Sequence, residues 1–262
     1  MREHRALNAI LEPGGIWSVY QPIMHVEGAA HLAGFECLSR GPKGTNFESA
    51  KVMFEYVRLK REETLVDRAC VAAALANAPK AAGLKLTVNV HASTLGRDHD
   101  FPDFLCATAD ANGIAHEQLT VEIVEHAPPW DSIGFAAALN RLRDRGMRIS
   151  LDDVGLGQSN FKMILDVRPD FLKLDRYFVE SCDSDRDRQA VIAMVVNLAA
   201  HFDAQVIAEG VDTPAVSEAL QRFGVRYMQG YLFAEPLTAE AAALWSAATP
   251  VAAFTAAAEP RQ

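Results

Sequence analysis

Short apolar runs rich in β-branched residues recur along the chain, and after the second run they alternate with segments of helix length. The expected strands are Ser18–Met24, Gly34–Arg40, Leu86–His91, Leu119–Glu125, Arg148–Val154, Phe171–Val179, Gln205–Val211 and Tyr227–Phe233. The expected helices are Ala50–Leu65, Val66–Ala78, Asp100–Asn112, Ile133–Arg145, Asp187–His201, Pro214–Phe223 and Ala239–Ala258. This alternation is typical of a βα barrel, an α/β fold whose reactive groups gather at one mouth.

The first connection departs from an ordinary eightfold βα barrel. Nine residues separate Met24 from Gly34, whereas a parallel crossover needs about a dozen or more. The first two strands are therefore expected to pair as an antiparallel hairpin.

Length and composition indicate one large core. The chain has 262 residues, of which 50% are hydrophobic, which suits one barrel domain. We expect a single domain over residues 1–262, with a core at about 16–240 and a C-terminal helix and frayed tail after it. The four cysteines show no zinc-like spacing and are expected to be reduced thiols.

Charge and hydropathy limit the partners. The formal net charge of −9 argues against a nucleic-acid polymer or an anionic membrane surface as the main partner, because both favour a basic face. No window approaches the ~18 apolar residues of a membrane span, and Met1 to Pro13 lacks an apolar signal core. We expect a soluble cytoplasmic protein.

Seven of the eight expected strands carry a polar group near their C-terminal end: Glu36, Asn89, Glu122, Asp152 with Asp153, Lys173, Glu209 and Gln229. Five of these residues, from Glu36 to Asp153 in chain order, offer oxygen donors, the ligands that Mg²⁺ and Mn²⁺ prefer. The adjacent carboxylates Asp152 and Asp153 could share two cations, a device for in-line attack of water on a phosphodiester. Lys173 and Glu209 are then candidates to orient or deprotonate that water.

Other readings of the same residues stay open. Any one of these carboxylates alone is typical of a cap or an ion pair, and it is their convergence that favours a site. Lys173 could neutralise Asp152 or Asp175, or form a Schiff base in a barrel lyase. The Gly155-Leu156-Gly157 segment could be an ordinary turn.

Several motifs resemble those of the EAL domain family, whose members hydrolyse cyclic di-GMP. They lie between about Tyr20 and Pro236 and comprise Tyr20-Gln21-Pro22-Ile23, Gly34-Phe35-Glu36-Cys37-Leu38-Ser39-Arg40, Val88-Asn89-Val90, Val121 to Glu125, Asp152 to Asn160, Lys173-Leu174-Asp175, Ala208-Glu209-Gly210-Val211 and Gln229-Gly230-Tyr231. The resemblance implies a modified TIM (βα)8 barrel with an antiparallel first strand. It also implies a metal-dependent phosphodiesterase that hydrolyses cyclic di-GMP to linear pGpG, with two Mg²⁺ or Mn²⁺ ions and a homodimeric assembly.

The resemblance also implies roles for individual residues. Metal ligands would be Glu36, Asn89, Glu122, Asp152 and Asp153, while Lys173 would hold the attacking water, Glu209 would act as base or metal support, and Gln229 would orient its neighbours. Substrate contacts would come from Gln21, Leu38, Arg40 and Asp67, with Arg40 meeting a phosphate. Glu125, Gly155 and Gly157 would anchor the loop after Asp153.

This chain departs from the family pattern at a few positions. Cys37 replaces an alanine, His91 and Asn160 replace serines, Val154 replaces a phenylalanine, and no tryptophan follows Arg40. None of these changes removes an expected metal ligand. The rival hypotheses are a receptor that binds cyclic di-GMP with negligible turnover and a scaffold that binds only a protein partner.

Overall fold

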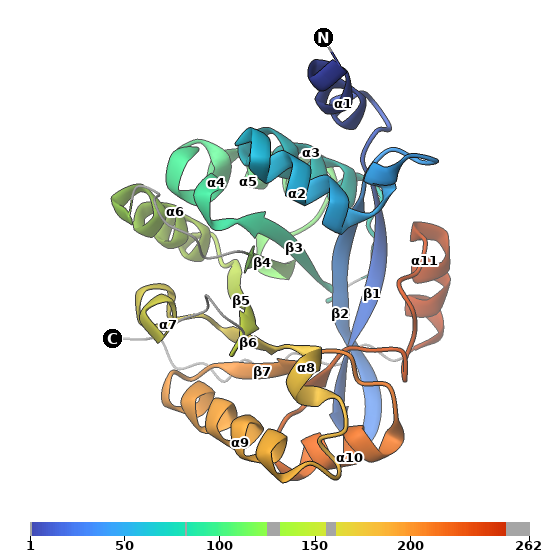
Figure 1. Ribbon diagram of the computed structural model, residues 1–262, viewed down its shortest axis with the longest axis vertical. Helices are drawn as coiled ribbons and strands as arrows, with labels where there is room; N and C mark the ends of the chain where they lie inside the picture. The colour runs from blue at the N-terminus through green and yellow to red at the C-terminus, as the bar shows by residue number, and fades with distance from the viewer. Residues whose placement is uncertain (1, 82, 125–131, 156–160, 250–262) are drawn as a thin grey trace.

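Eight strands close into a barrel in sequence order, as the computed structural model of residues 2–81, 83–124, 132–155 and 161–249 shows (Figure 1). The strands are β1 (Trp17–Glu27), β2 (Ala29–Arg40), β3 (Lys85–His91), β4 (Leu119–Val124), β5 (Arg148–Val154), β6 (Phe171–Leu174), β7 (Gln205–Ala208) and β8 (Tyr227–Met228). Tyr20, Phe35 and Leu86 are among the side chains that fill the main core between strands and helices.

Helices surround the strands (Figure 1). They are α1 (Arg2–Leu11), α2 (Ala50–Lys60), α3 (Glu63–Ala76), α4 (Ala92–Arg97), α5 (Phe101–Ala111), α6 (Ser132–Asp144), α7 (Phe161–Val167), α8 (Arg176–Val179), α9 (Arg186–His201), α10 (Pro214–Arg222) and α11 (Ala239–Ala248), with 3₁₀ turns η1 (Asn46–Glu48) and η2 (His116–Gln118). Within the described ranges, no helix has the length and apolar character needed to cross a membrane.

The antiparallel hairpin predicted for the first two strands is confirmed. β1 pairs with β2 from Trp17 opposite Arg40 to Glu27 opposite Ala29, and the turn at Gly28 has a φ of +75°, which glycine adopts without strain. β1 also pairs antiparallel with β8 and closes the barrel, while the other neighbouring strands pair in parallel. The fold is the expected modified TIM barrel.

Three predicted strands are too long, and one of them, expected over Gln205–Val211, ends at Ala208. The strand expected over Phe171–Val179 ends at Leu174, because the Asp175 side chain accepts a hydrogen bond from the Tyr177 backbone N–H (2.6 Å) and begins α8. The strand expected over Tyr227–Phe233 ends at Met228. The chain turns soon after, because the Gly230 carbonyl oxygen accepts hydrogen bonds from the backbone N–H groups of Phe233 (3.1 Å) and Ala234 (3.3 Å).

The helix boundaries also differ in places. Arg61 adopts a left-handed conformation with φ +57° and separates α2 from α3, so the break falls before the predicted boundary at Leu65. α1, α4, α7 and α8 were not predicted. The final helix ends at Ala248, and residues 250–258 of the predicted Ala239–Ala258 helix lie outside the described residues.

Candidate functional site

Lys173 lies at the centre of the polar cluster. It is 1% exposed, and its Nζ lies 2.6 Å from Glu209 Oε1, 2.7 Å from Glu122 Oε1 and 3.1 Å from Glu36 Oε2. Asp152 Oδ1 is 3.7 Å away. An ammonium has three N–H donors, so the three shorter contacts engage all of them. The predicted pairing of Lys173 with Asp152 is therefore present but secondary, and Asp175 instead caps α8.

Two amides fix the carboxylate of Glu36 on β2. Asn89 Nδ2 donates to Glu36 Oε1 and Gln229 Nε2 donates to Glu36 Oε2, each at 2.9 Å. Gln229 Nε2 also lies 2.9 Å from Gln21 Oε1. Side chains from β1, β2 and β3 and from the segment after β8 are thus joined at one end of the barrel. Cys37, next in the chain, faces the main core and is 2% exposed.

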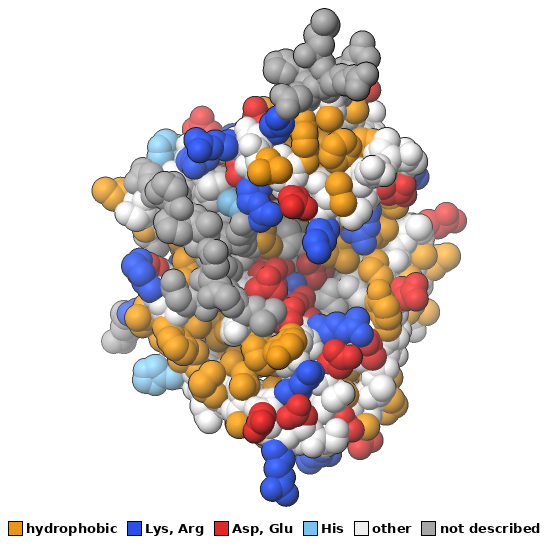
Figure 2. All heavy atoms as spheres, viewed as in Figure 1, with side chains coloured by type: hydrophobic (Ala, Val, Ile, Leu, Met, Phe, Trp, Pro, Cys, Tyr) orange, Lys and Arg blue, Asp and Glu red, His pale blue; other side chains and the backbone are white. Residues whose placement is uncertain are grey.

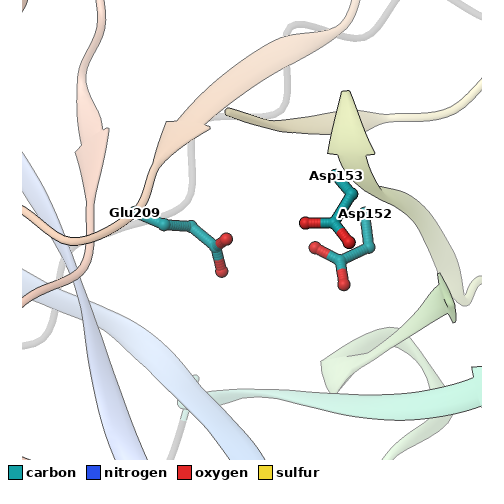
Figure 3. A group of neighbouring side chains, drawn as sticks. All are labelled: Asp152, Asp153 and Glu209. Carbon is teal, nitrogen blue, oxygen red and sulfur yellow. The ribbon is translucent and has the colours of Figure 1, made fainter. Parts of the chain in front are cut away.

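A β-bulge places two adjacent carboxylates at the same mouth. The β5–β6 register shifts between Leu151 and Val154, and Asp153 has φ +51°, so the normal alternation of side chains across the strand is broken. Ligand atoms of Asp152, Asp153 and Glu209 all lie within 4.8 Å of one another. The three carboxylates converge from β5 and the end of β7 (Figure 3), and acidic side chains gather near the centre of this face (Figure 2).

The charges of the cluster are strongly coupled. Burial alone would lower the pKa of Lys173, but Glu122, Glu209, Glu36 and Asp152 hold it well above its usual value. The pKa of Glu122 is raised well above its usual range by burial and by repulsion from Glu36. Burial opposes ionisation of Glu36 too, yet Lys173 and the two amides lower its pKa. Lys173 and Glu36 therefore form the ionised pair at the centre.

For Glu209 and Asp153, burial outweighs the favourable charge of Lys173. Burial raises the pKa of Glu209 to about 8, and burial with repulsion from Asp152 raises the pKa of Asp153 to about 6. Glu122 Oε2 is buried and accepts no hydrogen bond from the residues that the structure describes. Five carboxyls around one ammonium, all oxygen donors, fit hard divalent cations.

Three of the four expected substrate-contact residues lie on the hairpin near the mouth. Gln21 and Arg40 lie on β1 and β2, and Leu38 is partly exposed. Arg40 Nη1 donates to the Ser39 carbonyl oxygen (2.9 Å). Burial lowers the pKa of Arg40, although Glu36 and Tyr231 oppose that shift.

Asp67, the fourth expected substrate contact, is 4% exposed on α3. Its Oδ2 accepts hydrogen bonds from the His91 backbone N–H (2.9 Å) and from Thr94 Oγ1 (2.5 Å). Burial raises the pKa of Asp67 to about 7 in spite of these bonds. Its visible contacts are thus with the β3–α4 junction. The sequence analysis did not single out Thr94. The adjacent hydroxyl residues Ser93 and Thr94, just after the strand that ends at His91, were a signal that side chains could hydrogen-bond at this strand-to-helix turn.

Only part of the predicted loop anchor is described. Glu125 and Gly157 lie outside the described residues. Gly155 has φ +100°, and a Cβ there would lie 2.8 Å from the Phe178 ring, so both backbone and space favour glycine. Val154, at the end of β5, is 4% exposed in the main core.

The fold and the site define a closed α/β barrel with a carboxylate-rich, lysine-centred cluster at its mouth. The family model of the EAL domain matches residues 4–236, and the chain belongs to this family.

Curated relatives agree with this membership. The chain is 32% identical over 162 residues to the cyclic di-GMP phosphodiesterase PA2567 of Pseudomonas aeruginosa, an alignment that covers 62% of this chain and 27% of that protein. It is 28% identical over 241 residues to the probable cyclic di-GMP phosphodiesterase PdeI of Escherichia coli, covering 89% of this chain and 30% of that protein. The chain thus spans less than a third of the length of these relatives.

Solved structures show the same fold. BlrP1 of Klebsiella pneumoniae, in a manganese/cy-diGMP complex at pH 9.0, is 28% identical with a TM-score of 0.74 and covers 87% of this chain and 57% of that chain. A standalone versatile EAL protein of Vibrio cholerae O395, in its c-di-GMP-bound form, is 25% identical with a TM-score of 0.75 and covers 86% of this chain and 93% of that chain.

Proposed function

We propose that this chain is a phosphodiesterase that hydrolyses cyclic di-GMP to linear pGpG with the help of Mg²⁺ or Mn²⁺. The observation that carries the proposal is that Lys173 and Glu209 lie together with five oxygen-donor side chains at one mouth of the barrel: Glu36, Asn89, Glu122, Asp152 and Asp153. The names of the relatives support the substrate. A receptor that only binds nucleotide has no need of so many costly buried charges.

The donor set fits the cations that this reaction needs. Glu36, Asn89, Glu122, Asp152 and Asp153 would hold them, and the unbonded Glu122 Oε2 together with the excess of carboxylates supports that fit. Bound there, two divalent cations would steady the attacking and leaving oxygens of the phosphodiester. The same excess of carboxylates would otherwise repel an anionic substrate.

The chain's own residues have separable tasks in this proposal. Lys173 keeps three carboxyl groups together, and release of one of them leaves an N–H that can donate to the attacking water. Glu209, partly exposed beside Lys173, is placed to accept the proton of that water. Gln229 holds Glu36 in position, and Arg40 binds a phosphate oxygen.

The same geometry disfavours a Schiff-base lyase. An imine forms from a neutral amine, whereas the surrounding carboxylates raise the pKa of Lys173 well above its usual value. The ammonium form is therefore favoured at neutral pH.

The proposal is tested by incubating the protein with cyclic di-GMP in Mg²⁺, in Mn²⁺ and in chelator, and separating the nucleotides by chromatography. We expect pGpG only with metal, and a loss of at least about 100-fold in kcat for Glu36→Gln, because a charged ligand is removed from a preorganised site. The matched control is Glu218→Gln on the exposed surface of α10. Binding without hydrolysis would make the chain a receptor, and near-wild-type turnover of Glu36→Gln would refute the site.

A further inference from the structure

The inward face of the β1–β2 hairpin continues beyond the carboxylates to the rim of the barrel. Side chains alternate along a strand. Gln21 points inward and bonds Gln229, whereas Tyr20 points outward and donates to a carbonyl of α3. Trp17 is therefore on the inward face with Gln21, directly across from Arg40 in the register.

The indole of Trp17 is held at this rim. Its Nε1 donates to the Gly41 carbonyl oxygen (2.9 Å), the Lys43 Nζ lies 4.8 Å from the ring centroid, and the side chain stays partly exposed. Gly41 itself has no room for a side chain, because a Cβ there would lie 2.2 Å from the Phe47 carbonyl oxygen. An aromatic ring at this part of the rim thus comes from β1.

Two cations accompany the ring. Arg40 and Lys43 form no ion pair with any residue that the structure describes, in a chain whose formal net charge is −9. Cations that are not held in ion pairs are available to an anion, and a partly exposed indole is a stacking surface for a base. The cations and the indole lie at the rim of the same mouth. Glu36, Leu38 and Arg40 follow one another on the same face of β2, and Glu36 lies deepest in the barrel.

We propose that Trp17, Arg40 and Lys43 form a subsite for one nucleobase of the cyclic dinucleotide and the phosphate next to it. The indole stacks on the base, and the two cations meet the phosphate. This subsite rests on the proposed function, because it takes the same substrate and adds the contacts that select a nucleotide over a simple phosphodiester.

The chain has three tryptophans. Trp130 lies outside the described residues and is replaced by phenylalanine in every protein of this fluorescence test, which leaves Trp17 and Trp245 as a matched pair. Trp245 lies on α11 outside the barrel, against Phe35, so a base bound at the rim should quench Trp17 and leave Trp245 unaffected. Cyclic di-GMP is titrated into the whole protein in chelator, and again with Mn²⁺ by stopped flow so that binding is read before turnover. We expect the quench in the Trp130→Phe parent and after adding Trp245→Phe, and its loss after adding Trp17→Phe.

Affinity separates stacking from the hydrogen bond to Gly41. Trp17→Leu should raise the Kd and KM for cyclic di-GMP about tenfold with little change in kcat, while Trp17→Phe, which keeps an aromatic ring, should stay within about threefold. Lys43→Gln should raise KM and weaken its dependence on salt. Unchanged affinity in Trp17→Leu, or equal losses in Leu and Phe variants, would overturn the subsite with the phosphodiesterase intact. Absence of any nucleotide binding by the wild type would overturn both.

Discussion

At the scale of single residues, Lys173 shows how one cation organises several acids. Its three N–H groups contact Glu36, Glu122 and Glu209. Each of these carboxyls would therefore lose a hydrogen-bond donor if the Lys173 side chain turned away. Of these three carboxyls, Glu36 alone has further donors among the residues that the structure describes, namely Asn89 and Gln229, and its pKa is lowered while those of the other two are raised. All three carboxyls contact the ammonium, and the two amide hydrogen bonds are what distinguish Glu36 from the other two.

Glu122 offers a direct test of this view. Since burial and neighbouring acids raise its pKa well above the usual range, the metal-free protein should hold it as a neutral acid. Glu122→Gln should then leave the Tm in chelator within about 2 °C of the wild type, while Mn²⁺ affinity measured by calorimetry falls at least about tenfold. If Glu122 were an ionised partner of Lys173, breaking the pair would cost about 3–5 kcal/mol and lower Tm by roughly 6 °C or more.

At the scale of elements, the β3–α4 junction holds Asn89 in place. His91 stands where the family pattern has serine, and its Nδ1 accepts from the Ser93 backbone N–H (3.1 Å), so the ring takes over the capping role of a hydroxyl. Asp67 fixes the same turn from α3 through His91 and Thr94. The orientation of Asn89 toward Glu36 therefore depends on residues on a neighbouring helix.

Thr94 tests that dependence, because it is fully buried and cannot touch nucleotide. Thr94→Val keeps the side-chain shape but removes the donor to Asp67, which should cost about 1–3 kcal/mol in the free energy of unfolding measured with urea, and weaken Mn²⁺ binding through Asn89. Thr94→Ser, which keeps the hydroxyl, serves as the control. Equal stability of all three proteins would show that Asp67 does not need this bond, and would favour its predicted role as a substrate contact.

The elements also show what a sequence can and cannot predict here. The hairpin was predicted from the short spacing between Met24 and Gly34. The polar residues at the strand ends were recognised because their neighbours in the sequence are apolar. The early end of β6 was missed because it depends on the Asp175 cap. The bulge at Asp153 was missed because a register shift depends on how two strands pair. The sequence of one strand alone does not reveal that pairing.

At the scale of the whole molecule, negative charge is concentrated where the chain can least solvate it. The net charge of −9 includes the five carboxyls at the mouth. Repulsion among these carboxyls lowers the free energy of unfolding. Bound cations can offset this loss, since ligands that bind only the folded state stabilise it. The acid cluster should thus make the fold itself sensitive to both pH and metal.

The sign of the pH effect follows from the raised pKa values. Folding raises the pKa of Glu209 from 4.5 to about 8, of Asp67 from 3.8 to about 7 and of Asp153 from 3.8 to about 6. At a pH between the unfolded and folded pKa values of these groups, the folded metal-free protein binds more protons than the unfolded chain. Its free energy of unfolding therefore falls as the pH rises through this interval. Tm in chelator should be higher at pH 5.5 than at pH 8, as measured by calorimetry.

Two variations make this prediction specific to the barrel mouth. Mn²⁺ should raise Tm more at pH 8 than at pH 5.5, because protons and cations compete for the same carboxyls. Glu209→Gln should flatten the fall in Tm between about pH 6 and pH 8, since its titration spans that interval. A Tm that rises from pH 5.5 to pH 8 in chelator would mean that the mouth carboxyls are already stabilised as anions by the chain alone, and the case for cations at this site would lose its electrostatic basis.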